Sequence, residues 1–342
     1  MKADLNIDFI GKRKIYYTIS IVLISLGIII SAIFGVNLSI DFTGGAIIKY
    51  SYTGAVDRNT AQSVAVKALS SQSGMEVSTK LDEDFGTHTK TIVYEINRNL
   101  TSDMQANLYK TVSSQFSGNN ITKYSSDNVS ASIGAQFLQK SVLAVLLASI
   151  LIVLYIWFRF RKIGGLPAGI TAFIALVHDV IMGYVAFALM RIPLDANFIA
   201  VTLTILGYSI NDTIVVYDRV RENRRLYGSK IPFKDIVNKS INQSFARSIN
   251  TSLATFSAIA VLGIFSIVYR LDSVTSFALP MMVGVATGCY STICIAGPLW
   301  VSWETHKENK AQAAKERQAQ EKEQRRKNLE EARAKKASKK KK

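Results

Sequence analysis

The chain has 342 residues, 49% of them hydrophobic, and its 41 Lys and Arg against 25 Asp and Glu give a net charge of +16. This charge does not indicate nucleic acid as the main partner, because residues 305–342 hold fifteen Lys and Arg against six Asp and Glu. Cys289 and Cys294 lie in one apolar stretch and point to different sides of a helix, so we expect small apolar fillers, no metal site and no cofactor.

Apolar residues gather in six blocks, each close to the ~20 residues that an α-helix needs to cross a bilayer. The blocks are 15–36, 139–158, 166–190, 197–217, 249–268 and 275–300. The first is too long for a signal peptide and has no small-residue cleavage site, so we expect it to stay as an anchor. The predicted fold class is an α-helical integral membrane protein with six transmembrane helices.

Lys and Arg favour one side of these helices. They lie before the first block, between the second and third, between the fourth and fifth, and after the sixth. Positive residues mark cytoplasmic segments. We therefore expect a cytoplasmic N-terminus (1–14), transmembrane helix 1 (15–36), an outer domain (37–135), transmembrane helices 2–6 (136–304) with a cytoplasmic basic loop (218–247), and a basic cytoplasmic tail (305–342).

The outer segment has a soluble-domain pattern. Strand and helix signals alternate as strand 46–52, helix 59–73, strands 75–81 and 90–96, a helix capped by Ser102, and strand 121–125. The order β-α-β-β-α-β is that of a ferredoxin-like domain. It contains no nucleophile or metal constellation, which favours binding or docking over chemistry.

The tail alternates Ala, Lys, Glu, Gln and Arg with few apolar residues. A solvated helix is the favoured interpretation. Contact of its terminal lysines with anionic membrane lipids or with ribosomal RNA is the alternative.

Asp212 lies inside the fourth apolar block, where a charge costs about 2.5–3.5 kcal/mol on insertion scales. Thr204 and Tyr208 share its helix face at i−8 and i−4, and Asn211 lies about 100° around the axis. Such a carboxylate must be paired, hydrated or protonated. It marks an ion path or, on the alternative interpretation, a buried Asp held by hydrogen bonds between helices.

A second polar stripe, Arg247, Asn250, Thr251 and Thr255, begins the fifth block. Asp212 and Arg247 fall at similar predicted depth, so a proton-responsive pair is expected, with an Arg247 that reaches the headgroups as the alternative. His178 and Asp179 lie in the middle of the third block. Asp179 is the stronger candidate for a proton path, and structural hydrogen bonding is as plausible for His178.

Three motifs resemble the SecF members of the SecD/SecF family of protein-export membrane proteins. They are SIDFTGGA at 39–46, VHDV at 177–180 and LGYSINDTIVVYDRVREN at 206–223. The resemblance implies a non-enzymatic subunit of the SecDF accessory complex in the bacterial plasma (inner) membrane. Its implied partners are SecD, the SecYEG channel, the unfolded exported polypeptide and protons as coupling ion. Asp212 and Arg247 correspond by position to the family's proton-conducting charges, and Asp218 belongs to the third motif.

Two other classes share some of these features. A resistance-nodulation-type antiporter of small molecules and protons shares the six-helix half, but such proteins usually carry two halves and large outer domains in one chain. An intramembrane aspartyl protease needs two carboxylates sharing a proton. Asp179 and Asp212 are the only mid-span pair, without the GxGD context, and no HExxH or GxSxG motif occurs.

Overall fold

The computed structural model describes residues 6–70, 74–84, 87, 89–129, 131–228, 230–269 and 271–339. Within these residues, six helical segments are long and apolar enough to cross a membrane, which confirms the predicted fold class. They are α1 (Arg13–Phe34), α5 (Ala131–Arg159), α6 (Gly165–Leu189), α7 (Ala196–Tyr227), α8 (Phe233–Val268), and α9 (Asp272–Ser291) running through a π-helical segment (Thr292–Ala296) into α10 (Gly297–Lys339).

The helices form a bundle in which some helices are largely exposed and others are largely buried. Apolar side chains on α1 and α5, such as Ile33 and Leu151, are about two-thirds exposed, as lipid-facing positions would be. Helices α6, α7 and α9 are buried along much of their length and pack against one another. Buried polar side chains lie where α6, α7, α8 and α9 meet; they include Asp179, Ser209, Asp212, Ser248 and Ser291.

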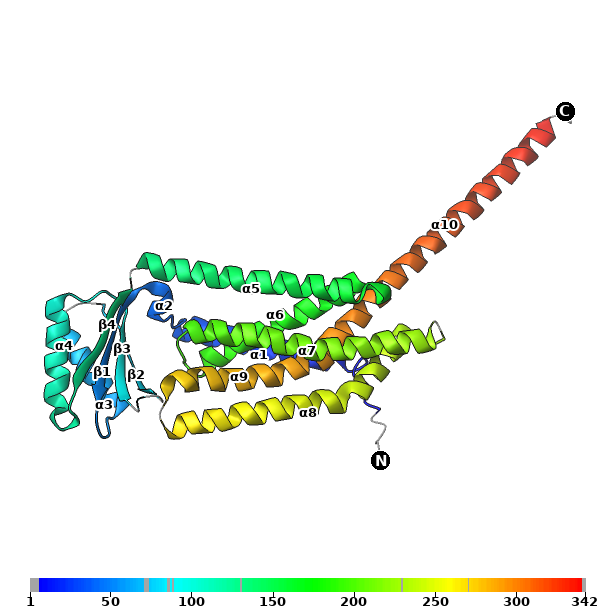
Figure 1. Cartoon of the computed structure of the whole chain (residues 1–342). Helices are drawn as coiled ribbons and strands as arrows, with labels where there is room; N and C mark the ends of the chain where they lie inside the picture. Colours follow the sequence, from blue (N-terminus) through cyan, green and yellow to red (C-terminus); the bar gives the residue numbers. More distant parts are fainter. Residues whose placement is uncertain are drawn as a thin grey trace.

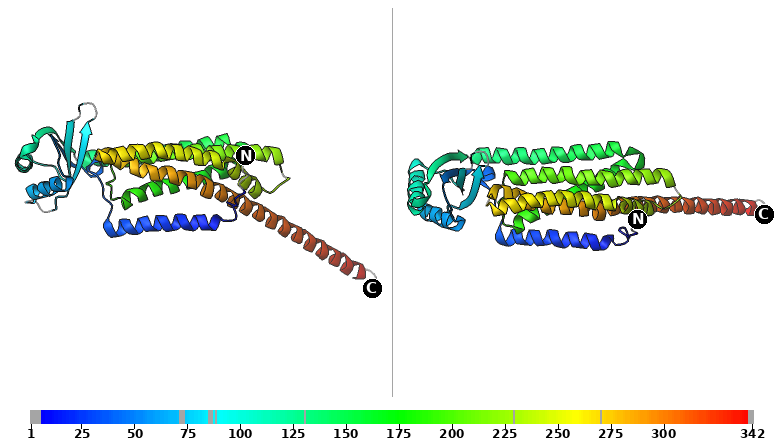
Figure 2. Two further views of the ribbon diagram at one scale, coloured as in Figure 1. Left: turned by 90° about the horizontal axis from the view of Figure 1, so that it is seen from below. Right: turned by 60° about the horizontal axis from the view of Figure 1, so that its bottom comes forward.

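An α+β domain (residues 40–129) lies at one end of the bundle (Figure 1). Its elements are α2 (Ile40–Thr43), β1 (Gly45–Tyr52), α3 (Arg58–Leu69), β2 (Val77–Asp84), β3 (Thr89–Ile96), α4 (Ser102–Gln115), the short 3-10 helix η1 (Ser117–Asn119) and β4 (Thr122–Val129). The antiparallel sheet has the order β2-β3-β1-β4, which with the two helices gives the predicted ferredoxin-like topology. Helices α3 and α4 lie on the sheet face turned away from the bundle (Figures 1 and 2).

The twin glycines of the first motif make the entry into β1 possible. Gly44 has a φ of +78°, a conformation that favours glycine. A Cβ on Gly45 would lie 2.1 Å from the carbonyl oxygen of Ile96, on the neighbouring strand. The two glycines thus serve different needs, a left-handed turn and a close approach between backbones.

Several boundaries differ from the sequence-based expectations. Thr101, not Ser102, caps α4, because the Thr101 hydroxyl accepts from the Met104 amide. Helix α3 ends at Leu69, and residues 71–73 lie outside the described residues. Helix α5 begins at Ala131, before the expected end of the outer segment. The basic segment 218–247 is not an extended loop, since α7 runs to Tyr227 and α8 begins at Phe233.

The end of the bundle opposite the α+β domain, which we call the tail end, holds the start of α1, the α7–α8 turn and the exit of α10 (Figures 1 and 2). Helix α10 carries the exposed tail away from the bundle as one continuous helix. At the same end, the segment before α1 is fixed to α8, where the side-chain amide of Asn242 bonds both the N–H and the C=O of Ile7. The bundle thus carries the α+β domain at one end, and the segment before α1 and the exposed tail at the other.

Candidate functional site

Asp179 lies at the centre of the bundle and is fully buried. Its Oδ2 accepts hydrogen bonds of 2.6 Å from the Ser209 hydroxyl on α7 and from the Ser291 hydroxyl on α9. Its Oδ1 lies 3.0 Å from Nδ1 of His178. One carboxylate thus joins three helices through hydroxyl donors, and the His178 ring lies beside it.

His178 is also buried, and its second ring nitrogen, Nε2, has no hydrogen-bond partner among the described residues. The ring lies 6.1 Å, between centroids, from the ring of Tyr290. Although adjacent helix residues point about 100° apart, the imidazole turns back onto the carboxylate of Asp179. His178 is therefore in position to orient Asp179.

Asp212 lies one helical turn along α7 from Ser209 and is 8% exposed. Its Oδ1 accepts a 2.6 Å hydrogen bond from the Ser248 hydroxyl on α8. Its Oδ2 is buried without a hydrogen-bond partner in the described part of the chain. No Lys or Arg of the described residues forms an ion pair with either Asp179 or Asp212.

We call these residues the carboxylate–serine cluster: Asp179, Ser209, Ser291, Asp212 and Ser248. A negative charge within it is stabilised by hydroxyl dipoles and, at Asp179, also by the neighbouring His178 ring. Burying an ionised carboxylate costs far more than these neutral donors return, unless a cation or a proton neutralises it. The chemistry that this geometry favours is uptake and release of a proton.

The face of α8 that meets α7 is a serine ladder, composed of Ser240, Ser244, Ser248 and Ser252. All four are buried and recur every fourth residue, so they share one helix face. Ser240 accepts from the Asn223 side-chain amide, and Ser252 accepts from the Tyr208 hydroxyl at 2.8 Å. The recurrence of serine at every fourth residue is visible in the sequence, and it could have identified Ser248 as the partner of Asp212.

The predicted stripe of Arg247, Asn250 and Thr251 lies on an exposed face of α8 instead. Arg247 is adjacent to Ser248 in the chain, and it makes no ion pair with Asp212 in the described structure. On α7, Thr204 and Asn211 are exposed as well. Two neighbouring helices thus each carry exposed polar side chains within their apolar stretches.

Asp218 lies nearer the tail end of α7. Its carboxylate oxygens lie 3.0 Å from Arg159 and 2.9 Å from Arg221. It is about one-third exposed and therefore differs from Asp179 and Asp212 in both exposure and partners. The structure thus brings Tyr208, Asp212, Asp179 and His178 into the bundle interior and leaves Asp218 at its rim.

A groove of about 1350 Å³ opens at the tail end beside the serine ladder. Ser244 and Arg247 line it, together with the basic side chains Arg219, Arg221, Arg224 and Arg225 and the acidic side chains Asp218 and Glu222. Ser244 precedes Ser248 by one helical turn. The groove therefore reaches to within about two turns of Asp212 along the ladder.

The π-helical segment Thr292–Ala296 follows Ser291 directly. The hydroxyls of Thr292 and Thr213 share a hydrogen bond of 2.9 Å between the π-helical segment and α7. Single π turns within α-helices are frequent at functional sites because they re-aim side chains. Here the π turn adjoins the serine that holds Asp179.

Within the described residues, no group of three or more His, Cys, Asp or Glu is placed to hold a metal ion. Cys289 and Cys294 are free and buried. The buried polar groups described above are thus carboxylates, hydroxyls, the Asn223 amide and the His178 imidazole.

Comparisons with known proteins match this architecture. The family described as "Protein export membrane protein SecD/SecF, C-terminal" matches residues 94–306, and "SecD/SecF GG Motif" matches residues 29–56. The protein translocase subunit SecF of Calditerrivibrio nitroreducens is 33% identical over 305 residues, which cover 87% of this chain and 94% of the relative. That of Sebaldella termitidis is 34% identical over 297 residues, covering 86% and 91%.

The crystal structure of SecDF, a translocon-associated membrane protein from Thermus thermophilus, superposes on this chain with a TM-score of 0.73 at 30% identity. The match covers 89% of this chain and 40% of the SecDF chain, so this chain spans less than half of that protein. The relatives are named as translocase subunits, which are transport components rather than enzymes. The chain is thus a multi-pass membrane protein that belongs to the SecD/SecF protein-export family, as a SecF member.

Proposed function

We propose that the chain works with a SecD partner as a proton-driven accessory subunit of the protein-export channel, with Asp212 as the site that takes up the proton. The observation that carries the proposal is the state of Asp212. It is buried among membrane helices, it has one hydroxyl donor, and its second oxygen has no partner in the described structure. A bound proton would neutralise the carboxylate and remove most of its cost in this place.

The energy available is sufficient for a conformational step. One elementary charge that crosses 100 mV releases about 2.3 kcal/mol. A shift of this size changes a two-state equilibrium about fifty-fold, because each 1.4 kcal/mol is a factor of ten. Alternating protonation of Asp212 would therefore be able to bias the position of α7 or α8.

A route for the proton on the tail side follows from the serine ladder. Ser248 contacts Asp212, and Ser244, one turn further, lines the groove at the tail end. A serine hydroxyl both donates and accepts, so it passes a proton on without holding a charge. We propose that Ser248 and Ser244, with water in the groove, connect Asp212 to the cytoplasm, and that Asp179 and His178 support the relay from the other side.

The orientation rests on the basic side chains at the tail end. The groove arginines and the Lys-rich tail lie there, opposite the α+β domain, which by the positive-inside rule makes the tail end cytoplasmic. Both termini would then face the cytoplasm of a bacterium, across its inner membrane. The α+β domain would lie outside, where it meets the emerging unfolded polypeptide beside the SecYEG channel.

The exposed polar face of α7 and α8 supports a partner within the membrane. Asn211, Thr204, Arg247 and Asn250 would be costly against lipid tails. A second six-helix half, as SecD provides, would cover them with polar groups of its own. Arg247 would then lie between the two halves, near the groove and one residue from Ser248, so we retain it as part of the proton pathway.

The test is Asp212→Asn in vesicles that contain this chain, its SecD partner and the export channel. We expect the Asp212→Asn protein to fold, because the amide replaces the carboxylate with little change of volume, but to lose both proton flux and the proton-driven part of export. Asp235→Asn, an exposed aspartate in the first turn of α8 that does not line the groove, is the control and should keep most of both activities. Full flux and full export with Asp212→Asn would contradict the proposal.

A further inference from the structure

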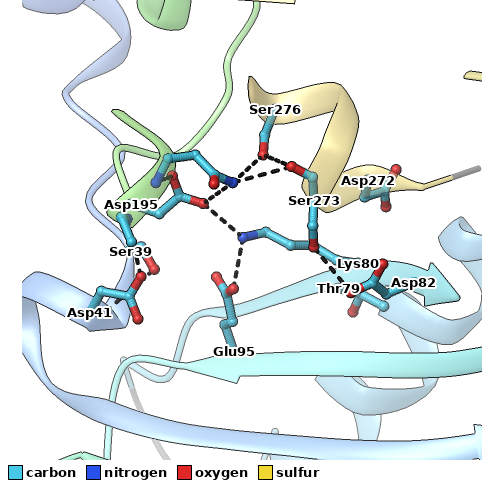
Figure 3. A network of polar contacts seen from close by, with 12 residues as sticks. Ser39, Asp41, Thr79, Lys80, Asp82, Glu95, Asp195, Asp272, Ser273 and Ser276 are labelled. Atoms are coloured by element: carbon cyan, nitrogen blue, oxygen red, sulfur yellow. Dashed lines mark hydrogen bonds and ion pairs between the residues drawn. The ribbon is translucent and has the colours of Figure 1, made fainter. Parts of the chain in front are cut away.

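Lys80 is a nearly buried lysine on the face of the sheet that is turned toward the bundle. Strand β2 pairs with β3 so that Lys80 lies opposite Val93, and Glu95 follows two residues on, on the same face. The Lys80 ammonium lies 2.7 Å from Glu95 Oε1 and 3.5 Å from Asp195 Oδ2 (Figure 3). Only 11% of its side chain is exposed. One cation thus bridges a carboxylate of the domain and a carboxylate of the bundle.

Asp195 is also the N-cap of α7, the helix that carries Asp212. Its Oδ1 accepts from the backbone amides of Asn197 and Phe198, at 2.9 and 3.3 Å. The Asn197 side-chain amide donates to the Ser276 hydroxyl and the Ser273 carbonyl on α9. Lys80 therefore contacts the first turn of α7 and, through Asn197, the first turn of α9.

The neighbours of Lys80 in β2 are held by the same end of the bundle. The Leu81 amide donates to Asp272 Oδ2 at 2.9 Å, and the Ser273 hydroxyl donates to Asp82 Oδ2 at 3.2 Å. We call Lys80, Glu95, Asp195 and Asp272 the docking cluster. Three successive residues of one strand are thus fixed to the outer ends of α7 and α9, and Figure 3 shows the contacts of Lys80 and Asp82.

The surroundings of Lys80 favour its charged form. Burial by itself would lower the pKa of Lys80, but the carboxylates of Glu95 and Asp195 outweigh it and raise this pKa above its ordinary value. Burial raises the pKa of Asp195, although the Lys80 charge and two backbone amides oppose the rise. Lys80 is therefore cationic at neutral pH. A buried cation between two carboxylates adds little to the net stability, but it fixes the position of the domain on the bundle.

We propose that the Lys80–Asp195 ion pair is the coupling contact through which α7 moves the α+β domain. The proposal rests on the proposed function, in which the proton binds Asp212 on the same helix. Helix α7 is continuous from Ala196 to Tyr227, and sixteen residues, or about 24 Å of helix, separate Ala196 from Asp212. A rigid displacement of α7 at Asp212 therefore appears at its N-cap, and Lys80 carries it to β2.

The sharpest test uses Asp195→Asn. Asn caps a helix as well as Asp does, and Lys80 keeps Glu95, so this change removes the ion pair between domain and bundle and leaves no buried cation unpaired. In vesicles with the SecD partner and the channel, we expect proton flux to stay within about twofold while export falls about fivefold or more, the lower end of typical coupling effects. Asp212→Asn, in contrast, should abolish both.

Lys80→Met is the second variant, and Lys49→Met is its control. Lys49 lies on β1 on the same sheet face, and no ion pair of the described residues includes it. Lys80→Met should reproduce the split between flux and export, Lys49→Met should change neither, and Lys80→Arg should retain export. Normal export with both Asp195→Asn and Lys80→Met would overturn the coupling proposal, and so would an equal loss of flux and export. Retained flux with Asp212→Asn would instead overturn the proposed function.

Discussion

The docking cluster and the carboxylate–serine cluster neutralise buried carboxylates in different ways. At the end of the bundle, Glu95 and Asp195 share the Lys80 ammonium. Inside the bundle, Asp179 and Asp212 accept hydrogen bonds from serine hydroxyls, and no Lys or Arg of the described residues forms an ion pair with them. A carboxylate fixed by a cation loses an ion pair when it is protonated, whereas one held by a hydroxyl keeps a hydrogen bond, because the hydroxyl accepts from the protonated carboxyl group. The first arrangement suits a mechanical link, and the second suits a proton site.

The largest expected effect lies in the docking cluster. Lys80→Ala leaves Asp195 and Glu95 as buried carboxylates without their cation, a kind of change that costs about 3–5 kcal/mol. Hydrogen–deuterium exchange should show faster exchange of amides in β2 and in the first turn of α7. The amides around Asp212 should not change. If these amides exchange equally slowly in Lys80→Ala and in the control Lys49→Ala, Lys80 does not fix the domain to the bundle, and the contrast between the two clusters fails.

Inside the bundle, Asp179→Ala should lower stability more than Asp179→Asn. The alanine leaves the buried Ser209 hydroxyl without an acceptor, at about 1–3 kcal/mol, while the Ser291 hydroxyl keeps the Gly288 carbonyl as an acceptor. The asparagine keeps an acceptor oxygen in the same place. Thermal unfolding of the purified protein in detergent measures the difference. Indistinguishable midpoints for the two variants would mean that Asp179 does not tie α7 to α9.

Ser248→Ala removes the one hydroxyl donor of Asp212 and one step of the proposed route. A hydrogen bond to a charged group contributes about 1.5–3 kcal/mol, so a charged Asp212 becomes harder to form and proton flux should fall about tenfold. The matched control is Ser266→Ala, a buried serine of the same helix that bonds the Gly263 carbonyl. Flux in Ser248→Ala equal to that in the control would exclude Ser248 from the route.

The smallest effect on the isolated chain is expected on the exposed polar face. Asn211→Leu should change the stability of the chain alone by less than about 0.5 kcal/mol, as exposed substitutions usually do. It should nevertheless reduce the amount of SecD that copurifies, since a leucine cannot meet the polar groups of the partner. Leu151→Ala on the exposed side of α5 is the control. If as much SecD copurifies with Asn211→Leu as with the unchanged chain, the surface around Asn211 does not contact the partner.

Much of the architecture followed from local sequence patterns. The six apolar blocks predicted the six spans, because hydrocarbon thickness sets helix length. Alternating strand and helix signals predicted the ferredoxin-like order, and the twin glycines coincide with a turn and a close contact that need them. The predicted helix ends were less accurate where a helix continues past its apolar stretch, as α7 does to Tyr227.

The orientation of α8 could not be predicted in this way. Its sequence holds two polar stripes, one with Arg247 and one with Ser248, about 100° apart. In water the apolar side of a helix marks the interior, but lipid is as apolar as a protein core, so the pattern does not say which stripe turns inward. Packing against α7 decided it, and placed the serines rather than the arginine against Asp212.

The sequence by itself therefore determined that carboxylates are buried in the membrane, because Asp179 and Asp212 interrupt stretches that must lie in hydrocarbon. It did not determine what neutralises them. Lys80 and Asp195 are far apart in the chain, as are Ser291 and Asp179, and these contacts form when a domain docks on helix ends or when three helices converge. Partners of buried charges are set by distance and desolvation in the folded state, and only the tertiary structure supplies both.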